Sequence, residues 1–221
     1  MAEVHGAAAA AGQPPTRFVC ADDEGAAAAA EVLRDGGVIV VPTDTVYGLA
    51  ARPDDEAAVA AVYRAKGRPE GMHLPVLAAS LAQVRALGVE FDDAAARLAS
   101  LWWPGPLTLA FGFGKVPERP TWLAGREEVA VRIPDHDFLR ALLTWTGVLV
   151  VTSANHHGDP TPPTAGGAAR ILGESVGLIV DGGRLAEVPS TLVNVRGSEP
   201  VVEREGAISR GEVAAALAGA P

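Results

Sequence analysis

The fold of this chain is decided by the stretch from Val38 to Pro69, which reads VIVVPTDTVYGLAARPDDEAAVAAVYRAKGRP. It opens with four consecutive β-branched apolar residues, a run with the length and composition of a buried strand. Pro42 ends that strand, because proline has no backbone N–H to donate to a neighbouring strand. Hydroxyl side chains follow on Thr43, Thr45 and Tyr47, so the pattern predicts a buried strand that leads into a polar loop.

The second half of the stretch predicts a helix that ends in two cations. Asp54 is the expected N-cap, and apolar residues recur with helical spacing at Ala58, Val59, Val62 and Tyr63. Lys66 and Arg68 close the helix, and such a pair can hold an anion, lysine as a point charge and arginine as a fork. Cations are also favoured at any helix C-terminus, so a structural role stays open. The chain has only one other lysine, Lys115, so Lys66 does not belong to a lysine-coated surface.

Length and charge limit the classes of function. The 221 residues suit one large domain, and we expect residues 1–15 to be a disordered tail rich in Ala, Gly and Pro, followed by a domain over 16–221. The formal net charge of −9 counts against a broad nucleic-acid-binding surface, which requires a basic patch. A local basic cleft for a small anion is compatible with this charge and would stand out against an acidic body.

The composition also limits the cellular compartment and the kinds of metal site that we expect. Cys20 is the only cysteine, which excludes disulfides within the chain and counts against thiolate metal sites. No apolar run has the length of a membrane span, and the first 15 residues lack the basic start and apolar segment of a signal peptide. We therefore expect a cytoplasmic protein with no membrane partner.

Strand and helix patterns alternate irregularly along the rest of the chain. We predict strands at 17–20, 38–41, 75–79, 107–111, 129–133, 148–151, 178–180, 192–195 and 200–204. We predict helices at 24–34, 55–66, 80–87, 91–102, 137–145, 165–172 and 209–217, with capping boxes at the 80–87 and 209–217 helices. The lack of strict alternation favours an α/β fold whose sheet includes antiparallel pairs.

A second apolar strand repeats the pattern of the first. It ends at Val151 and leads into Thr152–Asn155, and loops at strand C-termini are where open α/β sheets hold ligands. Ser153 and Asn155 are two residues apart and so share one side of an extended segment, although an ordinary Asn/Ser turn would have the same sequence. Arg132 lies in an apolar strand, where it either reaches the rim or pairs with a carboxylate.

Three patterns that suggest other chemistry do not hold. The segment 112–115 reads Gly-Phe-Gly-Lys, but it lacks the glycine spacing and the hydroxyl residue of a phosphate loop, and we expect a hairpin turn there. No metal-ligand spacing links the five histidines, which are His5, His73, His136, His156 and His157. No Gly-x-Ser-x-Gly elbow occurs, so an acyl-transfer serine has no support.

Taken together, these segments resemble the YrdC-type threonylcarbamoyl-AMP synthases in their short form, without the extra C-terminal domain of longer members. The similarity runs from about Arg17 to Leu217 and includes the Lys-x-Arg and Ser-x-Asn pair of that family. The matching pieces are PTDTVYGL at 42–49, KGRP at 66–69, WPGPLT at 103–108, VAVRIP at 129–134, TSAN at 152–155 with Gly158 and Pro160, Ser190-Thr191, and Arg204 with Gly206.

The resemblance implies a fold and a reaction. The fold would be a twisted, open, mixed β-sheet flanked by helices, with a large central cleft. The reaction would join L-threonine, bicarbonate and ATP into threonylcarbamoyl-AMP and pyrophosphate, as a nucleotidyltransferase does. The product would pass to a separate tRNA threonylcarbamoyl transferase for threonylcarbamoyladenosine modification of tRNA. Mg²⁺ would accompany ATP, held mainly by phosphate and water because the sequence suggests no carboxylate cage.

The resemblance also assigns residues by position. Threonine would contact Thr45, Arg132 and Ser190, with Arg132 as a fork on its carboxylate. ATP and the carbamate would lie near Lys66, Arg68, Ser153, Asn155, Thr161 and Arg204, with Lys66 and Arg68 as the catalytic pair. Two positions depart from the pattern: Leu77 stands where longer relatives carry a threonine-contacting histidine, and His73 replaces a common proline.

Other functions remain open from the sequence. The same fold without synthase activity could serve as an RNA-binding module, although the acidic balance and scarcity of lysine count against it and against strong direct tRNA contact. A carbamoyl-handling domain of hydrogenase maturation proteins is a further alternative, but no Cys-rich segment accompanies this chain. A sister branch of the family is another, and the intact Ser153–Asn155 motif speaks against it.

Overall fold

The computed structural model describes residues 16–69, 72–114 and 119–219, so the predicted tail and Lys115 lie outside the described residues. The strands are β1 (Arg17–Cys20), β2 (Ile39–Val41), β3 (Gly48–Ala51), β4 (Val76–Leu77), β5 (Leu107–Phe111), β6 (Val129–Arg132), β7 (Leu149–Ser153), β8 (Leu178–Asp181), β9 (Thr191–Asn194) and β10 (Val201–Arg204). The helices are α1 (Asp23–Arg34), α2 (Glu56–Lys66), α3 (Leu81–Arg85), α4 (Asp93–Trp102), α5 (Asp137–Thr146), α6 (Ala165–Leu172) and α7 (Arg210–Leu217).

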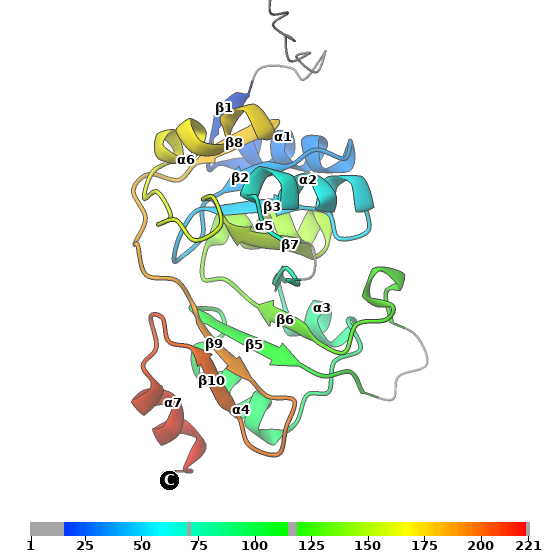
Figure 1. Ribbon diagram of the computed structural model, residues 1–221, viewed down its shortest axis with the longest axis vertical. Helices are drawn as coiled ribbons and strands as arrows, with labels where there is room; N and C mark the ends of the chain where they lie inside the picture. The colour runs from blue at the N-terminus through cyan, green and yellow to red at the C-terminus, as the bar shows by residue number, and fades with distance from the viewer. Residues whose placement is uncertain (1–15, 70–71, 115–118, 220–221) are drawn as a thin grey trace, which may run out of the picture.

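All of these strands join one mixed sheet in the order β1-β8-β2-β3-β7-β4-β6-β5-β9-β10. The upper half in Figure 1 contains β1, β8, β2, β3 and β7 with α1, α2, α5 and α6, and the lower half contains β6, β5, β9 and β10 with α3, α4 and α7. The two-residue strand β4 joins the halves, since it pairs antiparallel with β7 and parallel with β6. The expected α/β fold with a twisted mixed sheet is therefore confirmed.

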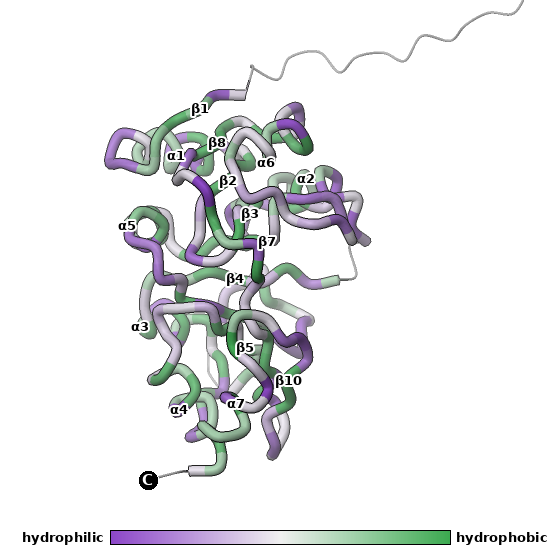
Figure 2. The backbone as a smooth tube through the Cα atoms, turned by 90° about the vertical axis from the view of Figure 1, so that its left-hand side faces the viewer, coloured by the Kyte–Doolittle hydropathy of each residue, from purple (hydrophilic) through white to green (hydrophobic). Residues whose placement is uncertain are grey.

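Strand β2 is buried on both of its faces, as its apolar run predicts. Val38 and Val40 pack into the cluster that also holds residues of α2 and α6. Ile39 and Val41 pack into the opposite cluster, against α1 and α5. Alternate side chains of a strand point to opposite faces, so helices on both sides require a strand without polar positions. In Figure 2 this inner part of the upper half is mainly hydrophobic along the chain.

The register of three strands brings the two polar loops together. Val41, the last residue of β2, lies opposite Gly48 of β3, and Gly48 lies opposite Ser153 of β7. Because β3 is antiparallel to both neighbours, β2 and β7 end at the same edge of the sheet. The polar segments after Val41 and after Val151 are therefore neighbours, as expected for a ligand site at strand ends.

Most predicted elements are confirmed, and the exceptions are local. The N-cap of α2 is Asp55, whose carboxylate accepts from the Ala58 N–H at 3.0 Å, so the prediction of Asp54 is wrong. Asp54 instead pairs with Arg52. Strand β3 was not predicted, because its small residues lack β-branched side chains and its pairing with β2 and β7 determines its conformation.

The two predicted capping boxes differ. At Ser209 both hydrogen bonds of the box are present with Glu212. At Ser80 the hydroxyl accepts from the Gln83 N–H, but the Gln83 side chain accepts from Ala79 instead of returning to Ser80. The predicted hairpin turn at 112–115 falls partly outside the described residues; β5 and β6 on either side pair antiparallel, and Phe113 bridges to Val89. Among the described residues, no helix has the length and apolar character needed to cross a membrane.

Candidate functional site

A cleft of about 710 Å³ lies where the two halves of the molecule meet. Its lining comes from the loop after β2, the segment that follows α2, strands β4 to β7, and the segments around Ser190 and Arg204. Eight of the nine predicted site residues line it: Thr45, Arg68, Arg132, Ser153, Asn155, Thr161, Ser190 and Arg204. Lys66 is the exception. Leu77 and His73, the two departures noted in the sequence, also line the cleft.

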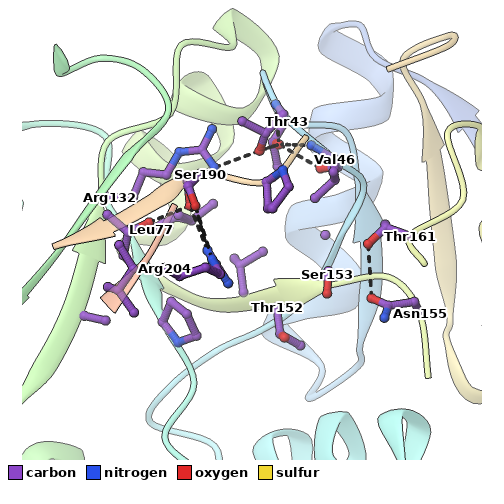
Figure 3. Close-up of a pocket in the computed structure, with 18 of the residues that line it drawn as sticks. Thr43, Val46, Leu77, Arg132, Thr152, Ser153, Asn155, Thr161, Ser190 and Arg204 are labelled. Carbon is purple, nitrogen blue, oxygen red and sulfur yellow. Dashed lines mark hydrogen bonds between the residues drawn. The ribbon is translucent and has the colours of Figure 1, made fainter. Parts of the chain in front are cut away.

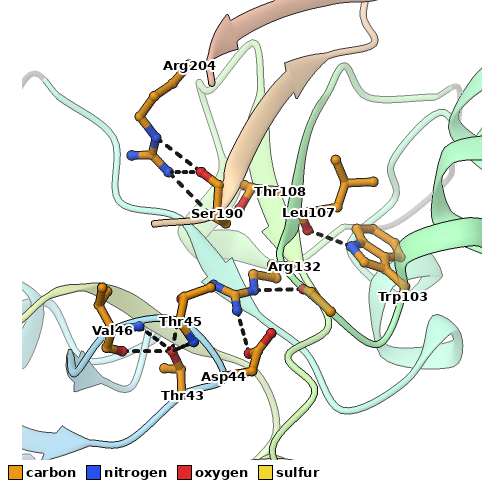
Figure 4. Close-up of polar contacts among 11 residues, drawn as sticks. Thr43, Asp44, Thr45, Val46, Trp103, Leu107, Thr108, Arg132, Ser190 and Arg204 are labelled. Carbon is orange, nitrogen blue, oxygen red and sulfur yellow. Dashed lines mark hydrogen bonds and ion pairs between the residues drawn. The ribbon is translucent and has the colours of Figure 1, made fainter. Parts of the chain in front are cut away.

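One end of the cleft is built around a buried arginine. Arg132 is 5% exposed, and its guanidinium forms an ion pair with Asp44, which confirms the carboxylate alternative for this residue. Its Nε donates to the Gly105 carbonyl at 2.9 Å and its Nη1 to the Thr45 hydroxyl at 2.8 Å (Figure 4). Burial lowers the pKa of Arg132, while the charge of Asp44 opposes that shift.

The loop that supplies Asp44 and Thr45 is organised by a neighbouring hydroxyl. The Thr43 Oγ1 donates to the Val46 carbonyl at 2.7 Å and accepts from the Thr45 backbone N–H at 3.0 Å. It also lies 3.1 Å from the Thr45 hydroxyl. This turn fixes the Thr45 hydroxyl toward Arg132. Tyr47, the third hydroxyl of the segment, points away and donates to the Gly183 carbonyl at 2.6 Å, so it supports the fold and does not line the cleft.

The lower wall carries a second hydroxyl pair. The Ser190 hydroxyl is 2.8 Å from the Thr108 hydroxyl of β5, and both residues are buried. Arg204 at the end of β10 donates from Nη2 to the Ser190 carbonyl at 2.9 Å and to its hydroxyl at 3.3 Å. Thr108 was not predicted as a site residue. The signal was its place at the end of the Trp-Pro-Gly-Pro-Leu-Thr motif, on the same sheet face as Ala110.

The upper wall is the loop after β7, and Lys66 lies behind it. The Lys66 Nζ donates to the backbone carbonyls of Ser153 at 2.6 Å and Asn155 at 2.9 Å. It also lies 3.3 Å from the Ser153 hydroxyl and 3.3 Å from the Asn155 Oδ1. Burial, and then the charge of Arg68, lower the pKa of Lys66 to about 8.

Arg68 is electrostatically coupled to two other cations, Lys66 and Arg204. Its charge lowers the pKa of both Lys66 and Arg204, after burial as the larger cause, so the three groups share one electrostatic environment. Its Nη2 donates to the His73 carbonyl at 3.1 Å. Among the described residues, no carboxylate forms an ion pair with Lys66, Arg68 or Arg204. Like charges held together in this way favour an anionic ligand.

The acidic residues on the cleft wall are mostly engaged elsewhere. Glu128 pairs with Arg196 at 3.0 Å, Glu187 with Arg184 at 3.1 Å, and Glu203 accepts from Asn194 at 2.7 Å. No group of three or more metal-ligating side chains occurs among the described residues, and Asp44 is taken by Arg132. The donor set therefore does not fit a dedicated magnesium site, and a nucleotide-borne ion would rely on phosphate and water.

Comparison with known proteins finds a matching family model and relatives of similar sequence. The Sua5/YciO/YrdC family model, described as telomere recombination, matches residues 31–206. A Bacillus subtilis protein named threonylcarbamoyl-AMP synthase is 36% identical over 188 residues, which cover 84% of this chain and 54% of that protein. The chain spans about half the length of this relative and of the similarly named Pyrococcus abyssi protein.

Solved structures share the fold over most of the chain. The crystal structure of Pyrococcus abyssi Sua5 complexed with L-threonine is 32% identical with a TM-score of 0.82, covering 92% of this chain and 60% of that one. The crystal structure of Escherichia coli YciO is 28% identical with a TM-score of 0.78, covering 89% of this chain and 98% of that one.

Proposed function

The chain belongs to the Sua5/YciO/YrdC family, and on this premise we propose that it is a threonylcarbamoyl-AMP synthase. The enzyme would join L-threonine, bicarbonate and ATP, releasing threonylcarbamoyl-AMP and pyrophosphate. The observation that carries the proposal is a cluster of three cations, Lys66, Arg68 and Arg204, none of which forms an ion pair with a carboxylate among the described residues. Arg68 and Arg204 line the same cleft as Arg132, and Lys66 lies behind its wall. Such a cleft suits a polyphosphate beside a small polar substrate.

The threonine subsite is proposed at the Arg132 end. The bonds to Asp44, Thr45 and Gly105 take three of the five guanidinium N–H groups of Arg132, one on each nitrogen. One N–H on each terminal nitrogen therefore stays available for the threonine carboxylate. The Thr45 and Ser190 hydroxyls line the same cleft and would orient the hydroxyl and amine of the substrate.

The nucleotide subsite is proposed between the walls that carry Arg68 and Arg204. Arg68, Ser153 and Arg204 line the cleft, as do Asn155 and Thr161, and Lys66 completes this subsite from behind the wall. We propose Arg68 as the catalytic cation; Lys66, the other residue of the expected catalytic pair, would act from behind Ser153 and Asn155. Mg²⁺ would enter with ATP and share its phosphate charge.

The chemistry requires no protein nucleophile. The threonine amine adds to bicarbonate with loss of water and gives a carbamate. A carbamate oxygen then attacks the α-phosphate of ATP, and the bond to the bridging oxygen breaks so that pyrophosphate leaves with the electron pair. Catalysis in this scheme is positioning together with neutralisation of the charge that develops on the phosphates. The product would pass to a tRNA threonylcarbamoyl transferase in the cytoplasm, and residues 16–221 would form the synthase domain.

The test is pyrophosphate release from ATP by the full chain, with threonine and bicarbonate omitted in turn. We expect release only when both are present, and carbon from labelled bicarbonate should appear in an adenylate. Release with threonine alone would show simple amino-acid activation. Absence of release together with salt-dependent tRNA binding would favour the RNA-binding module and overturn the proposal.

A further inference from the structure

The ammonium group of Lys66 is fully committed to one loop. Lys66 is 2% exposed and does not line the cleft. Its three N–H donors serve four acceptors, and all four belong to Ser153 or Asn155 at 2.6–3.3 Å. Direct contact with a phosphate would require at least one of these bonds to break.

The side-chain amide of Asn155 is committed in the same way. Its Oδ1 accepts from Lys66 and from the Thr161 hydroxyl, each at 3.3 Å. Its Nδ2 donates to the carbonyls of His156 at 2.7 Å and Asp159 at 2.6 Å. An amide offers two N–H donors and two oxygen lone pairs, so these four bonds account for its whole capacity.

Backbone contacts tie the same loop to the end of α2. The His157 N–H donates to the Lys66 carbonyl at 2.8 Å, and the His156 Nδ1 lies 3.2 Å from the Ala65 carbonyl. The Ala154 N–H donates to the Tyr47 carbonyl at 2.8 Å. The loop over residues 153–161 is thus wrapped around an interior made of the Lys66 ammonium and the Asn155 amide, with Thr161 closing it.

The free hydrogen-bonding capacity of this wall lies on Ser153. Because Lys66 can only donate, its contact makes the Ser153 Oγ an acceptor and leaves the hydroxyl proton of Ser153 free to donate. Ser153 lines the cleft together with Arg204 (Figure 3), so this donor is available to a ligand in the cleft. An O–H donor in a cleft that Arg68 also lines is suited to a phosphate or carbamate oxygen.

We propose that Lys66, Asn155 and Thr161 are positioning residues that shape the 153–161 loop and present the Ser153 hydroxyl to the ligand, while Ser153, Arg68 and Arg204 make the direct contacts. The identity of that ligand rests on the proposed function, whereas the internal organisation of the loop does not. The buried charge of Lys66 also adds to the positive field at the anion site without touching the anion.

The first test is hydrogen exchange of the full chain without any ligand. We expect Lys66→Met to speed exchange of the amides in residues 153–161 about tenfold, because the loop loses its central donors. Arg68→Met is the matched control, since it removes a neighbouring cation that lines the cleft, and it should leave this exchange unchanged. Unchanged exchange in Lys66→Met would overturn the proposal. If Lys66→Met does not fold, Thr161→Val removes one bond, keeps the buried charge, and should still speed exchange about threefold.

The second test asks whether Lys66 acts through Ser153. If it does, Ser153→Ala should lower pyrophosphate release much less in the Lys66→Met background than in the wild type. Arg204 provides the comparison, because it lies on the opposite half; Ser153→Ala should have its full effect in Arg204→Met. Multiplicative effects of Lys66→Met and Ser153→Ala would overturn the proposal. A chain that shows the exchange result but releases no pyrophosphate would refute only the proposed function.

Discussion

The two ends of the cleft differ in whether a carboxylate of the protein neutralises their arginines. At one end Arg132 is buried against Asp44, so its charge is compensated within the protein (Figure 4). At the other end burial and the charge of Arg68 lower the pKa of Arg204, and both arginines have only carbonyl and hydroxyl acceptors among the described residues. The compensated arginine is part of the framework, and the uncompensated pair leaves charge for a ligand to neutralise.

The arginines at the two ends therefore have different tasks, and their shared residue type does not distinguish these tasks in the sequence. An arginine that holds a loop, a strand and a carbonyl in place fixes the shape of a small subsite. Arginines without an internal counterion supply the field that binds and stabilises a polyanion. Variants at the Arg132 end should therefore lose mainly stability. Variants at the end with Arg68 and Arg204 should lose mainly turnover.

The largest effect should come from breaking the Arg132–Asp44 pair. Asp44→Asn leaves Arg132 as a buried charge without a counterion, which costs about 3–5 kcal/mol in the free energy of unfolding. Urea denaturation would measure this loss. Asp54→Asn is the matched control, because it breaks an exposed pair with Arg52 and should cost less than about 1 kcal/mol. Equal losses in the two variants would mean that the buried pair is no part of the framework.

Next in size is the loss of Arg68. Arg68→Met should lower pyrophosphate release about 100- to 1,000-fold, because a charge aimed at the phosphates is removed. The free energy of unfolding should stay unchanged or rise slightly, since like-charge repulsion with Lys66 and Arg204 is relieved. Arg64→Met, one turn earlier on α2 and exposed, should keep full activity. A large stability loss in Arg68→Met would erase the contrast between the two ends.

A smaller effect tests whether Ser190 belongs to the compensated end. Thr108→Val removes the hydroxyl that lies 2.8 Å from the Ser190 hydroxyl while keeping the shape of the side chain. We expect the KM for threonine to rise about fivefold with little change in kcat, as for the loss of about 1 kcal/mol of hydrogen bonding. A change in the KM for ATP alone would move Ser190 to the nucleotide end. The exposed Thr144→Val serves as the control.

The smallest effect is on pH dependence. Burial and Arg68 lower the pKa of Lys66 to about 8, against 10.5 as the ordinary value, so the unfolded chain binds more protons between these pH values. The contribution of Lys66 to the free energy of unfolding should therefore rise with pH across this window. Below pH 8 the cost of burying its charge is fully present. Charged or titratable neighbours on the adjoining segments are Arg68, His156, His157 and Asp159.

Activity should move in the opposite direction from stability. At pH 8 about half of the Lys66 groups lose a proton, so pyrophosphate release should fall about twofold relative to neutral pH. In Lys66→Arg, whose guanidinium stays charged, this step should be absent from the pH profile. A persisting step would assign the titration to another group.

Local sequence patterns predicted most of the helices and strands and most of the site residues. The helix α6 and the strand β5 have the predicted limits, because apolar periodicity and nearby turn residues determine both. The site residues were identified through ordered motifs, and folding brings eight of the nine into one cleft. Strand β3 could not be identified in this way, since Gly48–Ala51 becomes a strand only through neighbours from distant parts of the chain.

The sequence predicted which residues belong to the site better than it predicted the role of each side chain. Nothing in the sequence states that Asp44, 88 positions away, neutralises Arg132. Likewise Lys66 and Arg68 are two residues apart, yet one turns behind the loop and the other lines the cleft. These distinctions depend on which acceptors lie within 3 Å after folding, and spacing along the chain does not encode them.

The shortness of strand β4 affects how the sheet can bend. Strand β4 has only two residues, and together with the flanking backbone bonds of Pro75 to Val151 and of Ala78 to Arg132 it carries the whole pairing between β7 and β6. Leu77 of that strand is also part of the cleft wall. We therefore expect bending of the sheet to occur along β4 and to change the width of the cleft. The part of the sheet expected to bend most easily would then lie beside the space in which the proposed ligands bind.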